Sequence, residues 1–154
     1  MKLSNRVDIE APIDFVYAQL TDFAELERRA RREGVAVARS GDGPVARGTA
    51  WIVRAEVRGR MREFTVTLVA MSAPEALRFD TRSEGLEVET TLELIALSPH
   101  RTRVVVGIDM RARTLTVRLL LQSLKLAKAK LDARLRKRLT RVAHQIEDAY
   151  RLGG

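Results

Sequence analysis

The sequence predicts an α+β fold in which a curved, seven-stranded antiparallel sheet wraps onto a long C-terminal helix, in the order βααββββββα. Three observations predict this fold class. A helical pattern runs over residues 114–150, a period of two dominates residues 35–112, and a strand pattern followed by two short helical patterns occupies residues 3–32. Because so long a helix must lie across whatever the strands build, we expect the sheet to grip it.

The first of these segments reads as one strand and two helices. Residues 3–9 alternate between apolar and polar side chains, which is the period of a half-buried strand. Pro12 suits the first turn of a helix with an apolar side over residues 13–20. Thr21 and Asp22 interrupt that pattern and can cap a second helix over residues 23–32, which Gly34 ends.

Six strands are expected after Gly34, over residues 35–39, 49–58, 61–71, 77–83, 86–97 and 102–112. Turn residues separate the later strands at hairpin spacing, so these strands are expected to form an antiparallel meander. No linker or internal repeat interrupts the chain, and residues 1–154 are expected to form a single domain.

The C-terminal helical pattern has one main apolar face and one basic face. Nine basic residues between Arg118 and Arg141 stand against a single acid, Asp132, so this segment carries the whole net charge of +8. Leu115, Leu119 and Leu126 fall away from the main stripe and are expected to pack under loops or to contact a partner or membrane. The main stripe consists of Val117, Leu120, Leu121, Leu124, Leu131, Leu135, Leu139, Val142 and Ile146.

Residues 7–12, Val-Asp-Ile-Glu-Ala-Pro, and residues 15–23, Phe-Val-Tyr-Ala-Gln-Leu-Thr-Asp-Phe, resemble the START-like (SRPBCC) superfamily, as does the order of elements. This superfamily includes polyketide cyclase/dehydrase, lipid-transport-like and coenzyme-Q-binding-like proteins. The resemblance implies a helix-grip fold that holds a lipid, quinone or polyketide-like molecule between the sheet and the C-terminal helix. Many members carry Trp-Pro soon after the Asp-Phe step; residues 26–29 here read Leu-Glu-Arg-Arg, so the cavity entrance is expected to differ.

The more apolar parity of each strand, together with the helix stripe, is expected to line the cavity. Ala70 shares the parity of Phe64, Val66 and Leu68 and is expected on the same face. The alternative is that these side chains pack as an ordinary core and leave no cavity. The candidate ligand-binding residues are Trp51, Val53, Phe64, Val66, Phe79, Thr81, Val88, Thr90, Leu92, Val106, Leu124, Lys128, Leu131, Leu135 and Arg138.

Lys128 and Arg138 are the two charged members of this set. Lys128 falls within the apolar stripe of the helix and Arg138 at its edge. Either residue would suit a carboxylate or phosphate head group of the ligand. The alternative is that their long side chains reach water or pair with a sheet-rim acid such as Glu10 or Glu89.

The predicted inner face of the sheet offers little for catalysis. It contains no acid and no histidine, and the hydroxyls of Thr81 and Thr90 have no base beside them. His100 and His144 have no partner at metal-ligand or triad spacing. The sequence therefore favours binding without catalysis and indicates no cofactor and no metal. A polyketide cyclase or aromatase-like enzyme and an interaction module working through the basic helix are the alternatives.

The expected partner is a hydrophobic small molecule, while peripheral contact with an anionic membrane and a homodimer stay open. Nucleic acid is not favoured, because the chain has no P-loop and few aromatic residues. The chain contains no cysteine, and it shows neither a signal-peptide pattern nor an apolar run long enough to span a membrane. A cytoplasmic protein is therefore expected.

Overall fold

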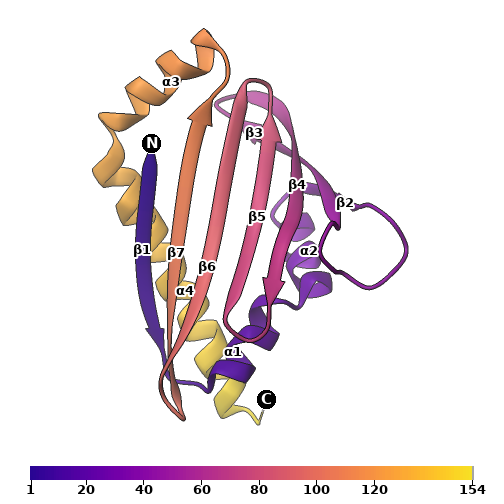
Figure 1. Ribbon diagram of the computed structural model, residues 1–154, viewed down its shortest axis with the longest axis vertical. Coiled ribbons are helices and arrows are strands. Elements are labelled where there is room, and N and C mark those ends of the chain that lie inside the picture. The colour runs from indigo at the N-terminus through magenta and orange to yellow at the C-terminus, as the bar shows by residue number, and fades with distance from the viewer. Residues whose placement is uncertain (154) are drawn as a thin grey trace.

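The computed structural model describes residues 1–153 (Figure 1). It confirms the predicted α+β helix-grip class, and each strand end lies within one residue of its predicted position. The elements are β1 (Lys2–Ile9), α1 (Ile13–Leu20), α2 (Phe23–Arg32), β2 (Ala36–Arg39), β3 (Ala50–Val57), β4 (Arg60–Ser72), β5 (Ala76–Ser83), β6 (Leu86–Ser98), β7 (Arg101–Ala112), α3 (Leu115–Lys125) and α4 (Lys128–Arg151).

The strands form one antiparallel sheet in the order β1-β7-β6-β5-β4-β3-β2. Strands β2 to β7 follow each other as a meander, and β1 joins the meander beside β7. Figure 1 shows α4, α1 and α2 behind the sheet, on one face of it, while α3 continues from the end of β7. The opposite face carries the charged side chains of the strands.

The strand register arranges the predicted inner residues in rows that cross the sheet. Trp51 lies opposite Val66, Val66 opposite Thr81, and Thr81 opposite Val88. Residues that face each other across antiparallel strands point to the same side, so each row presents one continuous surface to the helices. A second row consists of Leu68, Phe79, Thr90 and Ile108.

One predicted inner residue lies on the other face. Strand β4 has an irregularity between Leu68 and Ala70, which places Ala70 opposite Arg78 on the outer face. The prediction for Ala70 is therefore wrong. A β-bulge inserts an extra residue and reverses the parity of everything after it, and the local sequence carries no glycine to indicate one.

The C-terminal helical segment is two helices and not the single helix predicted. α3 ends at Lys125 and α4 begins at Lys128. The N–H groups of Leu126 and Ala127 bond to carbonyls only three residues back, which tightens the backbone at the break. The apolar stripe has no large apolar side chain between Leu124 and Leu131, so packing does not hold the helix straight there. Within residues 1–153, neither helix nor any other has the length and apolarity of a membrane span.

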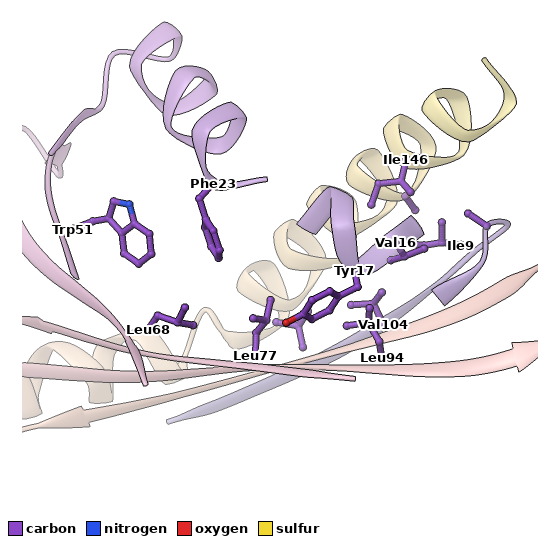
Figure 2. Close-up of a cluster of buried hydrophobic side chains, with 13 residues drawn as sticks. Ile9, Val16, Tyr17, Phe23, Trp51, Leu68, Leu77, Leu94, Val104 and Ile146 are labelled. Atoms are coloured by element: carbon purple, nitrogen blue, oxygen red, sulfur yellow. The ribbon is translucent and has the colours of Figure 1, made fainter. Parts of the chain in front are cut away.

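The buried core lies between α1, α4 and the adjoining strands. Figure 2 shows Ile9, Val16 and Ile146 gathered at one side of the cluster, with Phe23 and Trp51 at the other. Ile9, Val16, Leu68 and Leu77 are almost completely buried. At roughly 2 kcal/mol for each large apolar side chain removed from water, this cluster is the main source of stability.

Candidate functional site

The burial of the inner face falls from one end of the strands to the other. On β7, Val104 and Val106 are buried, whereas Ile108 and Met110 are half-buried. The neighbouring strands show the same change: Leu68, Leu77 and Leu94 are buried near α1, and most side chains nearer the opposite hairpins are only half-buried. These half-buried side chains are Val53, Phe64, Val66, Phe79, Thr81, Val88 and Thr90. The exceptions are Leu3 on β1 and Trp51, which packs on Phe23 of α2; both are buried.

The C-terminal helices follow the same trend. Ala143 and Ile146, near α1, are buried, while Leu124, Leu131 and Leu135 are half-buried. The space between the sheet and the helices is thus packed at the α1 end. At the other end, which leads into α3, apolar side chains from both layers stay partly uncovered. We call the space between the sheet and the C-terminal helices the groove, and its less buried end the open end.

An apolar pocket lies between α2 and strands β2 to β5, and it includes Val53, Val66 and Phe79 of the half-buried set. Its volume is about 190 Å³, below the range of roughly 300–1,000 Å³ usual for drug-sized ligands. The rings of Phe23 and Trp51 lie 5.4 Å apart, and each is 6.4 Å from the Phe79 ring. The pocket is lined by Phe23, Leu26, Glu27, Ala30, Val37, Trp51, Val53, Val66 and Phe79.

Glu27 is the one charged residue that lines this pocket. Its carboxylate accepts a hydrogen bond of 2.7 Å from the indole Nε1 of Trp51 and two of 2.7 and 3.0 Å from the guanidinium of Arg39. Burial by itself raises the pKa of Glu27, but the hydrogen bonds from Arg39 and Trp51 outweigh it, and the pKa lies below its usual value. Glu27 is therefore an ionised, oriented group at the edge of an apolar surface.

Two buried polar atoms face the interior without a hydrogen-bond partner among residues 1–153: the hydroxyl of Tyr17 and Oδ1 of Asp132. Figure 2 shows the Tyr17 hydroxyl directed toward Leu77, between the sheet and the helices. Burial raises the pKa of Tyr17, so its hydroxyl keeps its proton. On α4, the main-chain carbonyl of Asp132 accepts a hydrogen bond from Asn5 on the inner face of β1. Buried polar atoms normally have partners, so these two groups suit a polar atom supplied from outside the chain.

The structure brings four of the predicted binding residues together in the pocket under α2: Trp51, Val53, Val66 and Phe79. The remaining predicted strand residues lie on the same inner face. Of these, Val106 is buried in the core, and the others are half-buried: Phe64, Thr81, Val88, Thr90 and Leu92. Leu124, Leu131 and Leu135 are half-buried on α3 and α4, which pack against β7 and β1.

The two predicted cationic residues lie elsewhere. Lys128 is exposed at the first residue of α4. Arg138 is also exposed, and its guanidinium lies 3.7 Å from the carboxylate of Glu33, just beyond α2. Neither side chain is enclosed by the groove, so a role in reading a ligand head group stays a prediction for both.

Sequence reasoning missed the polar groups that the structure does place at the groove. Glu27 stands between Leu26 and Arg28 in a highly charged helix and looks like surface charge. The available signal was its spacing, since Phe23, Glu27 and Ala30 share one helical face. For Tyr17, the signal was a hydroxyl on the apolar side of α1, which needs a partner once buried.

The outer face of the sheet carries a wider hollow of about 750 Å³. Small side chains make it: Ser4 lies opposite Gly107, and Gly107 lies opposite Thr91. A Cβ at Gly107 would approach the Thr91 hydroxyl to 2.7 Å, so the glycine keeps this row flat. Charged side chains such as Arg78 and Glu93 border the hollow. Apolar side chains such as Leu77, Leu92 and Ile95 also line it, and it is larger than the pocket under α2.

The comparisons with known proteins agree on the fold. Residues 1–147 match the family model described as polyketide cyclase / dehydrase and lipid transport. A search of curated proteins by sequence found no match.

Among solved structures, the chain is similar to the Zhui aromatase/cyclase from a Streptomyces species, with a TM-score of 0.69, 17% identity and coverage of 100% of this chain and 98% of that one. It is also similar to a Thermus thermophilus protein, with a TM-score of 0.64, 16% identity and coverage of 97% and 99%. A START superfamily protein from Mycobacterium smegmatis gives a TM-score of 0.53, 14% identity and coverage of 88% and 97%. At these identities the likeness concerns the fold alone.

Proposed function

The chain belongs to the polyketide cyclase/dehydrase and lipid transport family, and from this premise we propose that it binds an apolar or amphipathic small molecule between the sheet and the C-terminal helices. A lipid, a quinone or a polyketide-like molecule fits this description. A cytoplasmic location is part of the proposal, and a chain without cysteine is compatible with that reducing compartment.

The observation that carries the proposal is the uneven burial of the inner face. Phe64, Phe79, Val88 and Leu124 belong to the face that folding should cover, yet they remain partly accessible. Covering apolar surface is favourable by about 25 cal/mol per Å², so a guest that fills the open end gains the free energy that packing leaves unrealised there.

The polar groups support an amphipathic guest. Glu27 at the α2 side is ionised and already satisfied by Arg39 and Trp51, so it would repel an anionic head group. The Tyr17 hydroxyl, at the packed end, has no partner among residues 1–153 and would suit a carbonyl or hydroxyl oxygen of a guest that extends from the open end to reach it. These groups favour a neutral oxygenated molecule with an apolar body over a free fatty acid.

Two matched variants test the proposal. Thr81 lies on the inner face at the open end, whereas Thr65 on the neighbouring strand is exposed on the outer face. Thr81→Phe should fill the open end and weaken binding of an environment-sensitive apolar fluorophore by about tenfold, while Thr65→Phe should leave it within about twofold. Fluorescence titration of both variants, with a long-chain alcohol and a short-chain quinone as competitors, measures this.

Two results would contradict the binding proposal. The proposal fails if the wild-type protein shows no saturable binding of the fluorophore, or if Thr81→Phe and Thr65→Phe bind it equally well. Native mass spectrometry of protein purified from its own source then provides an independent check, because a retained guest adds a defined mass.

A cyclase or aromatase-like activity is the second candidate. The observation that favours it is that two buried side chains, Tyr17 and Asp132, each have a polar atom without a hydrogen-bond partner among residues 1–153. Conversion of a poly-β-ketothioester analogue should then exceed the spontaneous rate and fall in both Tyr17→Phe and Asp132→Asn. An unchanged rate in both variants would leave only binding.

A further inference from the structure

The outward side of α3 carries three leucines that the fold leaves uncovered. Leu115 is 69% exposed, Leu119 is 56% exposed and Leu126, the residue that ends the helix, is 92% exposed. At roughly 100° per residue these positions fall within about 40° of one another, so they form one line along the helix. We call these three residues the leucine stripe. Single exposed leucines are ordinary in soluble proteins, but three in line are not.

The opposite side of the same helix is the one that packs. Leu121 is buried, and Val117, Leu120 and Leu124 are half-buried. The helix is therefore apolar on two sides, and only one side is used by the fold. Neither hydrogen bonding nor the cap explains the leucine stripe, because the helix is already capped by the Thr114 hydroxyl, which accepts from the N–H of Val117.

Basic residues flank the leucine stripe. Arg118 and Lys125 lie about 80–100° from its centre on the helical wheel, and Lys128 and Lys130 follow in the first turn of α4. All four are exposed, and no salt bridge involves any of them within residues 1–153. An apolar line with free cations beside it is the arrangement of a helix that lies in the interface of an anionic bilayer.

From this arrangement we propose that the leucine stripe docks onto an anionic membrane surface. The leucines enter the acyl boundary, and the flanking cations remain among the lipid head groups. A second copy of the chain is the competing occupant, and charge opposes it. Two facing copies would bring eight of these cations together, whereas the lipid head groups neutralise them.

The position of α3 connects this surface to the groove. Strand β7 leads directly into α3, and Leu86 at the start of β6 lies opposite Ala112 at the end of β7. Figure 1 shows the β3–β4 and β5–β6 turns at this same end of the molecule. Docking would therefore hold the open end of the groove near the bilayer. The docking proposal does not depend on that groove holding a guest.

The first experiment is sedimentation with phosphatidylcholine vesicles that contain about 30 mol % phosphatidylserine, compared with pure phosphatidylcholine vesicles. The wild-type chain should bind the anionic vesicles at low salt and be released as salt increases, because salt screens the head groups. Replacing the leucine stripe by Leu115→Gln, Leu119→Gln and Leu126→Gln should weaken binding by about tenfold. The single variants Arg118→Gln, Lys125→Gln and Lys130→Gln should each weaken vesicle binding about fivefold.

A matched control exists on the same chain. Ile95, Leu97 and Leu152 are exposed aliphatic residues outside α3. Changing these three to Gln should leave vesicle binding within about twofold of wild type. Circular dichroism and the unfolding midpoint show whether the leucine-stripe variant and the control variant fold.

The absence of cysteine allows a second, independent measurement. Leu126→Cys and Leu152→Cys each provide a single site for an environment-sensitive dye. With anionic vesicles, the emission of the dye at position 126 should shift to the blue, and that at position 152 should not. The proposal is overturned if neither dye shifts, if both shift equally, or if the control triple variant loses as much binding as the stripe variant. It is also overturned if the chain dimerises through the leucine stripe without binding vesicles, since the occupant is then a second copy.

Discussion

The two ends of the groove contain similar side chains in the same register and differ in what covers them. At the α1 end, Leu77 and Leu94 are buried by α1 and by the last turns of α4. At the other end, Val88 and Leu86 on the same sheet face are only half-buried. The difference does not come from β6 itself, because its side chains alternate regularly from Leu86 to Leu94. It comes from the helices, because the break after Lys125 separates α3 from α4 above the open end.

This comparison assigns different tasks to the two ends. A well-packed end loses contacts and gains a cavity when a side chain is shortened, so it determines stability. Side chains at the open end have fewer packing partners, so substitutions there should alter guest binding more than the free energy of unfolding.

The strongest contrast is expected along β6, where one strand supplies a leucine to each end. Leu94→Ala should lower the free energy of unfolding by about 3 kcal/mol, because it removes a buried side chain and leaves a cavity. Leu86→Ala should cost about 1 kcal/mol, since that leucine is half-buried and its removal opens no enclosed space. Urea denaturation of both variants measures the difference. Equal losses would show that the open end is packed as well as the closed end.

The second contrast lies within α2. Glu27 is enclosed by Arg39 and Trp51, while Glu25 on the solvent side pairs with Arg28 and Arg32. Glu27→Ala should lower the free energy of unfolding by about 2 kcal/mol, because it leaves the Trp51 N–H and the Arg39 guanidinium without their acceptor. Glu25→Ala should leave it nearly unchanged, since exposed ion pairs contribute little. If the two variants lose the same amount, the Glu27 cluster is no more than a surface ion pair.

Lowering the pH should remove the stabilisation that the ionised Glu27 gives to the fold. Its pKa is lowered in the folded protein, so its charged hydrogen bonds stabilise the fold fully above the usual pKa of glutamate and are lost as the pH falls through the lowered value. The difference in free energy of unfolding between wild type and Glu27→Gln should therefore be largest at neutral pH and should shrink as the pH falls below the usual pKa of glutamate. Asp8 and Glu87 also have lowered pKa values, but they titrate in both proteins and cancel in this difference. If this difference in free energy of unfolding does not change with pH, the shape of the Glu27 side chain and not its charge accounts for it.

The extent of sequence-based prediction follows the same division. Alternation along residues such as Trp51, Val53 and Phe64, together with turn residues between strands, is a local signal, and it predicted the strands and their inner face. The helix break at Leu126–Ala127 and the bulge before Ala70 have no local signal, because neither contains glycine or proline.

The candidate site was predictable only in part, for a related reason. The parity of a strand says which side chains face inward but not whether a helix covers them, since coverage depends on where α2, α3 and α4 pack. The polar groups were harder still. Glu27 and Asp132 lie in helices rich in charge, and their inward direction depends on tertiary packing that no short pattern encodes.

The smallest effect on stability is expected at Tyr17, which lies in the packed end but carries an unsatisfied hydroxyl. Tyr17→Phe should change the free energy of unfolding by less than about 1 kcal/mol and in the stabilising direction, because it removes a buried donor that has no partner within the described chain. The same variant should bind a long-chain alcohol several-fold more weakly if that hydroxyl meets the guest's oxygen, while binding of a pure hydrocarbon of equal length should not change. The two ligands therefore separate a polar contact from a change in shape. A clear destabilisation of Tyr17→Phe without any guest would show instead that the hydroxyl is already satisfied by water inside the fold.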